Sequence, residues 1–200
     1  MTHESELQHI ETSTTGLPNR KLAFWLFLAS ECMFFGALIA TYLVYQGKSL
    51  VGPYPDEILD IPLTTISTFV LLMSSLAMVL AVNASQRGDM RGTRLALLAT
   101  IAMGLTFLGF QVYEFTHFYH EGLTLSRNLF GSSFFVLTGF HGLHVSVGVF
   151  WLICLFAHTF RPVIPERRAI DIEVAGLYWH FVDIVWIVIF TVIYLIGASL

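Results

Sequence analysis

The stretch 138-TGFHGLHVSVGVFW-151 contains two histidines, three residues apart, in a run that is otherwise apolar or small. Polar side chains are costly inside hydrocarbon, so His141 and His144 need a physical explanation. Two explanations are open from the residues alone. The histidines bind something, such as a heme or a metal ion, or they hold neighbouring helices together through hydrogen bonds.

The composition is that of an integral membrane protein. Of the 200 residues, 56% are hydrophobic and only 12% are charged, against about 25% charged residues in an ordinary soluble domain. The mean hydropathy of +0.72 agrees, and the net charge of −4 gives no sign of nucleic-acid binding. Runs of about 20 apolar residues cross a bilayer as helices. Five such runs predict an all-α, polytopic membrane helix bundle, with spans at about 22–46, 61–84, 95–119, 133–158 and 174–198.

The distribution of charge predicts the topology. Residues 1–19 are polar and mostly acidic, unlike a signal peptide, so we expect a cytoplasmic tail ahead of a five-helix transmembrane domain at 20–200. Most of the ten Lys and Arg residues fall on one predicted side of the membrane: Arg20, Lys21, Arg87, Arg91, Arg94, Arg161, Arg167 and Arg168. Because positively charged flanks stay in the cytoplasm, the N-terminus is expected inside and the C-terminus outside.

Three carboxylates lie inside the predicted spans, and such residues are functional candidates because they normally face the bundle interior. They are Glu31, Glu114 and Asp183. The i,i+3 spacing places a second polar side chain on the same helix face in three cases: His180 with Asp183, His117 with Glu114, and His144 with His141. From the chain directions, we predict that Glu114 and His141 meet in the outer half of the membrane. Asp183, His180 and Glu31 are expected nearer the middle and the inner half.

A transmembrane b-heme is one chemistry that these residues could support. It needs axial histidines on facing helices and small residues that make room for the ring. The candidate ligands are His141 or His144 on one helix, with His117 or His180 on another. The small residues Gly139 and Gly142 lie beside the first pair.

Other chemistries are also open. A carboxylate-bridged di-iron site needs two Glu-x-x-His motifs, and only one occurs, at 114–117. An intramembrane serine protease needs a nucleophile with a base, and neither Ser132 nor Ser146 has a convincing motif around it. Interhelical hydrogen bonds, each worth about 0.6–2 kcal/mol in a membrane, explain the same residues without any chemistry. Proton relays and lipid sites are further possibilities.

Several other side chains in the spans are interpreted as packing residues. Cys32 and Cys154 are expected to be buried and to form neither a disulfide nor a metal site. Trp179 and Trp186 are expected to face lipid or neighbouring helices. They are one heptad apart and form a stripe on the last helix, which suits docking to a partner and equally suits contact with lipid. The second span carries small hydroxyl residues that allow close helix approach: Thr64, Thr65, Ser67, Thr68, Ser74 and Ser75.

The sequence resembles a known family at several points. The stretch 133-SFFVLTGFHGLHVSVGVFW-151 resembles the penultimate helix of subunit III of heme-copper terminal oxidases, and 178-YWHFVDIVWIVIFTVIYLIG-197 resembles its C-terminal helix. The stretches 28-LASECMFF-35 and 110-FQVYEF-115 resemble the regions around the family's two intramembrane glutamates. The four stretches occur in the family's order, and the resemblance covers nearly all of residues 20–198.

The resemblance implies a multi-pass accessory subunit, in the five-span form, of an aerobic respiratory oxidase in the bacterial cytoplasmic membrane. Such a subunit binds directly to catalytic subunit I, within a proton-pumping complex that also contains subunit II and an optional subunit IV. It carries no heme, copper or other redox centre. It stabilises the catalytic subunit, holds phospholipids and supports proton uptake while the complex reduces O₂ to water.

Within this family, the phrase at 138–142 looks more like the cytochrome c oxidase branch, so the expected function is that of a cytochrome c oxidase subunit III. One alternative is the equivalent subunit of a quinol oxidase. The other is a membrane anchor that binds b-heme.

The resemblance also implies roles for individual residues. Glu31 matches the family's carbodiimide-reactive carboxylate and is the candidate for proton uptake. His158, with Arg161 one turn further on, stands where longer relatives have an arginine that holds lipid headgroups. The remaining intramembrane polar residues are expected to form a buried packing network with no catalytic or metal-binding role: Glu114, His117, His141, His144, His180 and Asp183.

Overall fold

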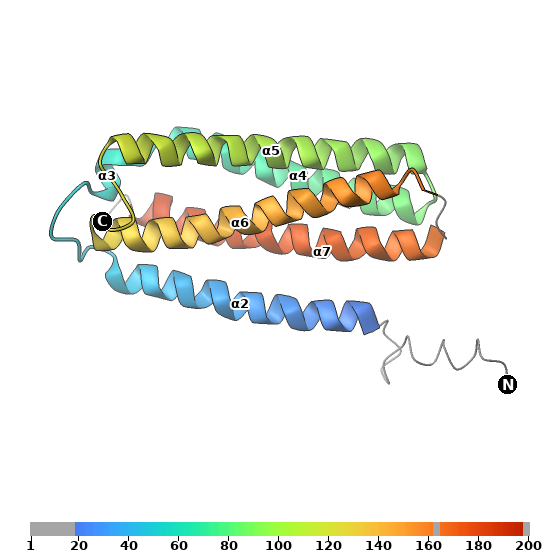
Figure 1. Cartoon of the computed structure of the whole chain (residues 1–200), viewed down its shortest axis with the longest axis horizontal. Helices are drawn as coiled ribbons and strands as arrows, with labels where there is room; N and C mark the ends of the chain where they lie inside the picture. Colours follow the sequence, from blue (N-terminus) through green and yellow to red (C-terminus); the bar gives the residue numbers. More distant parts are fainter. Residues whose placement is uncertain (1–18, 162–164, 198–200) are drawn as a thin grey trace.

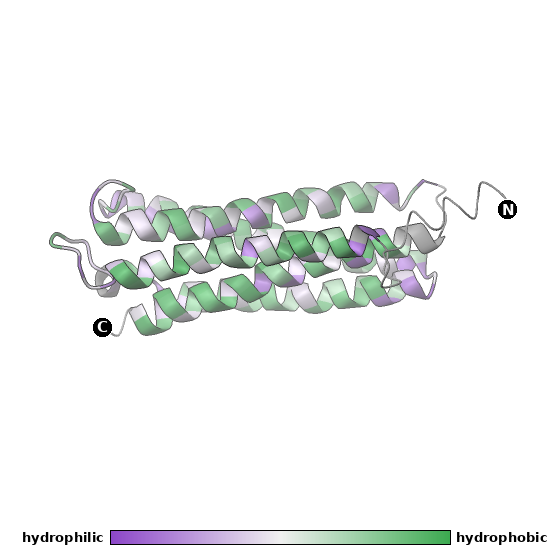
Figure 2. Ribbon diagram, turned by 90° about the horizontal axis from the view of Figure 1, so that it is seen from below, coloured by the Kyte–Doolittle hydropathy of each residue, from purple (hydrophilic) through white to green (hydrophobic). Residues whose placement is uncertain are grey.

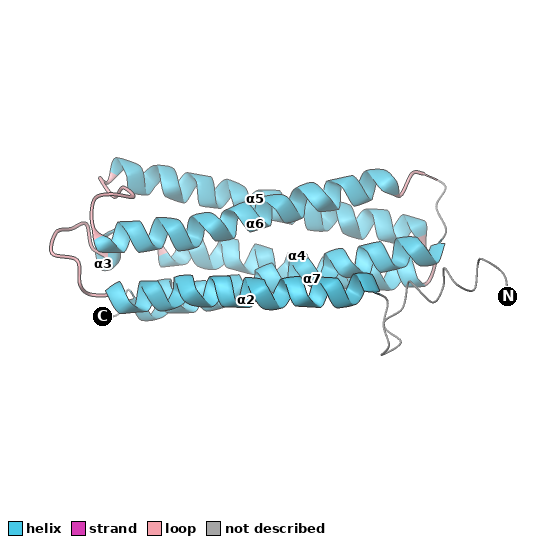
Figure 3. Ribbon diagram, turned by 60° about the horizontal axis from the view of Figure 1, so that its bottom comes forward, coloured by secondary structure: helices cyan, strands magenta, loops and turns pink. Residues whose placement is uncertain are grey.

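Five long helices lie side by side in the computed structural model, which describes residues 19–161 and 165–197 (Figure 1). The helices are α2 (Asn19–Tyr45), α4 (Ile61–Gln86), α5 (Met90–His120), α6 (Leu129–His158) and α7 (Pro165–Phe190). A short helix, α3 (Pro55–Ile58), lies in the first connection, and α7 continues into the π-helix η1 (Thr191–Ile196). The described part of the chain contains no strand (Figure 3). The prediction of an all-α bundle with five spans is therefore confirmed.

The helices run alternately up and down. The chain enters α2 at one end of the bundle and leaves η1 at the other (Figure 1). The longest helix, α5, has 31 residues and is about 46 Å long at 1.5 Å per residue, so it extends beyond a hydrocarbon core of about 30 Å. Apolar residues cover the lengths of the helices, and polar residues gather toward the ends (Figure 2). The side of the membrane on which each end lies remains a prediction, and the predicted tail lies almost wholly outside the described residues.

Side-chain caps extend two helices beyond their apolar runs. Asp89 accepts hydrogen bonds from the backbone N–H groups of Arg91 and Gly92, so α5 begins at Met90 rather than near residue 95. Asn128 accepts from the N–H of Gly131 at 2.7 Å and caps α6. A capping side chain satisfies N–H groups that the first turn leaves without a partner. The apolar runs predicted from the sequence, at about 95–119 and 133–158, do not include these first turns.

The centre of the bundle is built on the two tryptophans of α7. Trp179 and Trp186 are each only 2% exposed, so the stripe faces neighbouring helices, and the alternatives of lipid contact or docking to a partner are wrong. The Trp179 indole N–H donates to Ser74 Oγ on α4, and the Trp186 N–H donates to Thr68 Oγ1, both at 2.9 Å. The hydroxyl residues of the second span therefore do more than allow close approach. They accept hydrogen bonds from indoles that would otherwise be unpaired in an apolar interior.

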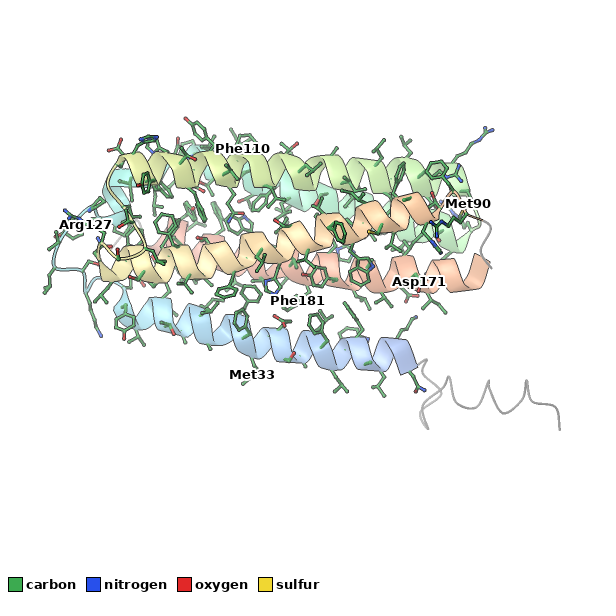
Figure 4. All side chains as sticks on the ribbon, viewed as in Figure 1. Met33, Met90, Phe110, Arg127, Asp171 and Phe181 are labelled. Atoms are coloured by element: carbon green, nitrogen blue, oxygen red, sulfur yellow. The ribbon has the colours of Figure 1, made fainter. Side chains whose placement is uncertain are left out.

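Helix α2 lies along one side of the other helices and contacts α6 and α7 (Figure 1). Most of its side chains are exposed. Met33 points away from the bundle, whereas Phe181 of α7 points toward α2 (Figure 4). Phe181 approaches Phe35 of α2 with ring centroids 6.3 Å apart. Because so few side chains of α2 are buried, its polar contacts with the bundle help to fix its position. One of these contacts lies in the candidate site.

Candidate functional site

A groove between α2 and α6 exposes a carboxylate part-way along the membrane-spanning helices. Its volume is about 340 Å³, and it is lined by Phe24, Phe27, Glu31, Leu143, His144, Val147, Trp151 and Tyr178. Glu31 is the only acidic residue in this lining and lies near the middle of α2. The Glu31 side chain is 18% exposed, so it is partly accessible from the groove. An acidic group at this depth normally has a partner.

The partner of Glu31 is His144. Its Nε2 lies 3.2 Å from Oε2 of Glu31. The other ring nitrogen, Nδ1, lies 2.7 Å from the carbonyl oxygen of Phe140. A carbonyl only accepts hydrogen bonds, so Nδ1 must carry a proton and donate it. The Tyr178 hydroxyl donates to the carbonyl of His144 at 3.0 Å and braces the same turn of α6 from α7.

The hydrogen-bond pattern at His144 determines how many protons the pair holds. In a neutral imidazole with Nδ1 protonated, Nε2 is an acceptor and cannot donate to a carboxylate. The contact at 3.2 Å is therefore a hydrogen bond only if Glu31 is protonated and donates, or if the imidazole carries a second proton and donates. Either state places one proton between Glu31 and His144 and leaves the pair without net charge. A neutral pair is far less costly in hydrocarbon than an isolated carboxylate.

Glu114 lies in a second polar cluster, nearer the end of the bundle where α5 ends. Its Oε1 accepts from Thr64 Oγ1 of α4 at 2.8 Å and from the Tyr194 hydroxyl of η1 at 2.9 Å. The predicted pairing of Glu114 with His141 is therefore wrong. The two residues lie on α5 and α6 as expected, but Glu114 faces α4 and η1 instead of α6.

His141 is fully enclosed and has different neighbours. It is 0% exposed, and its Nε2 lies 3.2 Å from the carbonyl oxygen of Val182, to which it donates. The imidazole stacks on the indole of Trp186 with ring centroids 4.7 Å apart. The Phe107 ring meets it edge-on at 5.9 Å. Because these contacts enclose the ring completely, the site does not fit a b-heme with His141 as an axial ligand.

The remaining members of the expected network have separate environments. His180 Nδ1 lies 2.6 Å from Ser75 Oγ of α4, and Asp183 is buried on the same helix. His117 is exposed, so its assignment to a buried network is wrong. The predicted set is therefore at least four separate groups: the Glu31 pair, the Glu114 cluster, the enclosed His141 and the His180 contact.

The predicted lipid-headgroup residues also separate. His158 lines a cavity of about 350 Å³ between α6 and α7, together with Trp151 and Asp171. Arg161 is exposed and is not among the residues that line this cavity. Cys154 lines the same cavity, and both Cys32 and Cys154 are free and exposed, so the expectation that they are buried is wrong.

Comparisons with known proteins identify the family. The family described as cytochrome c oxidase subunit III matches residues 1–198. The chain belongs to the cytochrome c oxidase subunit III family. It is therefore the kind of subunit that heme-copper oxidases contain beside their catalytic subunit, and it is a multi-pass bacterial membrane protein.

Similar curated proteins include subunits from Bacillus and Staphylococcus. Quinol oxidase subunit 3 of Bacillus subtilis (strain 168) is 40% identical over 178 residues, which are 89% of this chain and 87% of that protein. Quinol oxidase subunit 3 of Bacillus spizizenii has the same identity and the same coverage. Probable quinol oxidase subunit 3 of Staphylococcus aureus (strain USA300) is 38% identical over 197 residues, 98% of this chain and 92% of that protein.

Two tyrosines complete the sites of this subunit III and were not singled out from the sequence. Tyr178 braces His144, and Tyr194 binds Glu114. The spacing contains a signal for the second. Tyr194 follows Trp186 by two i,i+4 steps and so lies on the same helix face. Nothing in the sequence shows that this face meets Glu114, because that depends on how α5 and η1 pack.

Proposed function

We propose that this chain is subunit III of a quinol-oxidising heme-copper oxidase, which transfers electrons from quinol to O₂ and forms water. The observation that carries the proposal is the similarity to proteins named quinol oxidase subunit 3, which extends over 89–98% of the chain. The phrase at 138–142, which favours the cytochrome c branch, covers only five residues. The similarity over most of the chain therefore outweighs this short stretch. It supports a quinol oxidase subunit over a cytochrome c oxidase subunit.

The electron donor is tested on the complex that contains this chain. The chain is tagged, the complex is purified in mild detergent, and O₂ uptake is measured with a reduced quinol and, separately, with reduced cytochrome c. We expect rapid, inhibitor-sensitive uptake with quinol and little with cytochrome c. The opposite preference would refute the quinol assignment and restore the cytochrome c reading, while leaving the family unchanged.

This chain would contribute no redox centre to that complex. The enclosed packing of His141 against Trp186 and Val182 supports this proposal, because a ligated heme would have to displace both contacts. Replacing His141 by Leu removes a hydrogen bond and a stacked ring, so less intact complex should be recovered. The heme content per intact complex, measured by absorption, should not change. A proportional loss of heme would instead make His141 a ligand.

The role of the Glu31–His144 pair would be to hold a proton inside the membrane, next to a groove that accepts lipid chains. The apolar lining of the groove suits acyl chains. The geometry supports an exchangeable proton because the contact requires one proton between the two side chains. In the complex, the pair would support proton uptake by the catalytic subunit, and the lipid in the groove would help to fix α2.

A hydrophobic carbodiimide tests the accessibility of this proton. Such reagents react with protonated carboxyls that they can reach from lipid. Glu31 lines the groove and is 18% exposed, whereas Glu114 is 7% exposed and Asp183 is 5% exposed. We therefore expect mass spectrometry to find the adduct on Glu31, and Glu31→Gln to abolish it. Labelling of Glu114 or Asp183 alone would contradict the assignment.

A second experiment tests whether the proton matters for turnover. In Glu31→Gln the amide cannot release a proton, so O₂ reduction by the variant complex should decline during sustained turnover faster than in the wild type. Ser146→Ala is a matched control, because Ser146 is exposed on α6 and bonds only to its own helix at the carbonyl of Gly142. Equal decay in all three complexes would show that Glu31 is a structural residue.

A further inference from the structure

A small, partly enclosed cavity lies at the end of the bundle where α2 ends and α6 begins. Its volume is about 60 Å³, and it is lined by Tyr42, Tyr45, Gln46, Gly47, Ser49, Tyr54, Pro55, Phe130 and Ser133. These residues come from the last turn of α2, the first connection and the first turns of α6. None of them carries a charged side chain. This cavity is far smaller than the cavity of about 350 Å³ at His158 and the groove of about 340 Å³ at Glu31.

Two residues of the lining each carry a buried polar atom without a hydrogen-bond partner. These atoms are the hydroxyl oxygen of Tyr42, a residue only 1% exposed, and Nε2 of Gln46. Both lie near Gly197. A Cβ added to that glycine would be 2.9 Å from Tyr42 Oη and 3.6 Å from Gln46 Nε2. An unpaired buried donor is costly, and buried polar groups in native proteins nearly always have a protein or water partner.

We propose that ordered water fills this cavity and bridges Tyr42 to Gln46. One water needs about 10–15 Å³ of such space and two to four polar partners, so the cavity has room for one or a few molecules. Water can accept from the Gln46 amide and can donate to or accept from the Tyr42 hydroxyl. An ion is disfavoured, because no charged side chain lines the cavity to balance it.

The α6 side and the first connection supply further partners for the water. Ser49 Oγ accepts from the backbone N–H of Phe130 at 3.0 Å, which leaves its own hydroxyl proton for another acceptor. The water would therefore join the end of α2 to the start of α6 through hydrogen bonds. This polar connection of α2 to the bundle is independent of the Glu31–His144 pair and of the proposed oxidase function.

Radiolytic labelling in ¹⁸O-water tests the proposal on the intact complex in lipid nanodiscs. Hydroxyl radicals form from bound water and oxidise the side chains next to it. Two matched pairs exist among buried aromatic residues. Tyr42 and Phe130 line the cavity and are 1% and 6% exposed, whereas Tyr194 and Phe134 do not line it and are both 0% exposed. We expect incorporation of ¹⁸O at Tyr42 and Phe130 several-fold above that at Tyr194 and Phe134. Equal incorporation in the members of each pair would overturn the proposal.

A double variant distinguishes labelling by bound water from labelling by radicals that enter from the bulk solvent. Tyr42→Phe with Gln46→Leu removes both unpaired polar atoms while keeping the size of the side chains. Labelling of Phe130 should then fall several-fold, and labelling of Phe134 should not change. If Phe130 labelling persists in the double variant, the radicals come from bulk solvent and the bridging water is refuted. Should the double variant fail to assemble, Gln46→Leu alone provides the same readout, with a smaller loss expected.

Discussion

The substitution Gly104→Ala tests the centre of the bundle. Gly104 of α5 is buried against α6 and α7, where an added Cβ would lie 2.7 Å from the Trp179 ring and 2.9 Å from a methyl of Val149. Contacts under 3.0 Å require a shift of the neighbours. The Trp179 ring cannot move away easily, because its N–H is bonded to Ser74 at 2.9 Å and Gly148 approaches its other side.

The magnitude follows from two opposing terms. Replacing glycine by alanine within a helix favours folding by about 1 kcal/mol. Overpacking a rigid core disfavours it by about 1–3 kcal/mol, and here the contacts are with a ring and a β-branched side chain. We therefore expect Gly104→Ala to lower the free energy of unfolding by up to about 2 kcal/mol. Gly109→Ala on the same helix meets nothing within 4 Å and should raise it instead.

The assay is reversible unfolding of the full chain in mixed micelles by a titration with denaturing detergent, followed by tryptophan fluorescence. The two variants share the same chemical change and the same helix, so the difference between them isolates the clash with Trp179. If Gly104→Ala stabilises the chain as much as Gly109→Ala does, Trp179 does not pack against α5 as the structure has it. The central position of the tryptophans would then be wrong.

Two further predictions concern buried hydrogen bonds and use the same assay. Thr68→Val should lower the free energy of unfolding by about 0.6–1.7 kcal/mol, because it removes the acceptor of a buried indole N–H. Thr65→Val is its control, since Thr65 is exposed and bonds only to its own helix, and equal effects would refute the interhelical bond. Tyr194→Phe removes a donor to Glu114 and should be destabilising by a similar amount. Tyr113→Phe, at an exposed position of α5, is its control and should leave the free energy of unfolding unchanged. If Tyr194→Phe also leaves it unchanged, the hydrogen bond to Glu114 is refuted.

The number and type of the helices could be predicted because a backbone in lipid has no water with which to form hydrogen bonds. A segment in hydrocarbon must satisfy its N–H and C=O groups internally, so each apolar run of sufficient length becomes a helix. The helix faces could also be predicted in part, since i,i+3 spacing places His141 and His144 on one side of α6. Their partners could not. Spacing gives the face of a helix but not the helix that packs against it.

The burial of the tryptophan stripe was missed for a related reason. In a membrane, a side chain that faces lipid and one that faces the core are both apolar, so hydropathy does not separate them. Hydrogen bonding does separate them. Trp179 and Trp186 are seven residues apart and each carry one donor, and their acceptors Ser74 and Thr68 are six residues apart on the second span. Matching donors on one helix with acceptors on another is the stronger sequence signal for an interior position.

Polar contacts at separate levels explain how α2 stays on the bundle while so much of its surface is exposed. Lipid tails are as apolar as leucine, so the hydrophobic effect does not drive α2 onto α6 and α7 inside a membrane. Lys21 bonds to Glu173 at 2.7 Å at the start of α2, and Glu31 bonds to His144 near its middle. The Lys21 contact is partly exposed and is weakened by solvent. The middle contact lies within the predicted span, so we expect loss of the proton that it requires to weaken the attachment of α2.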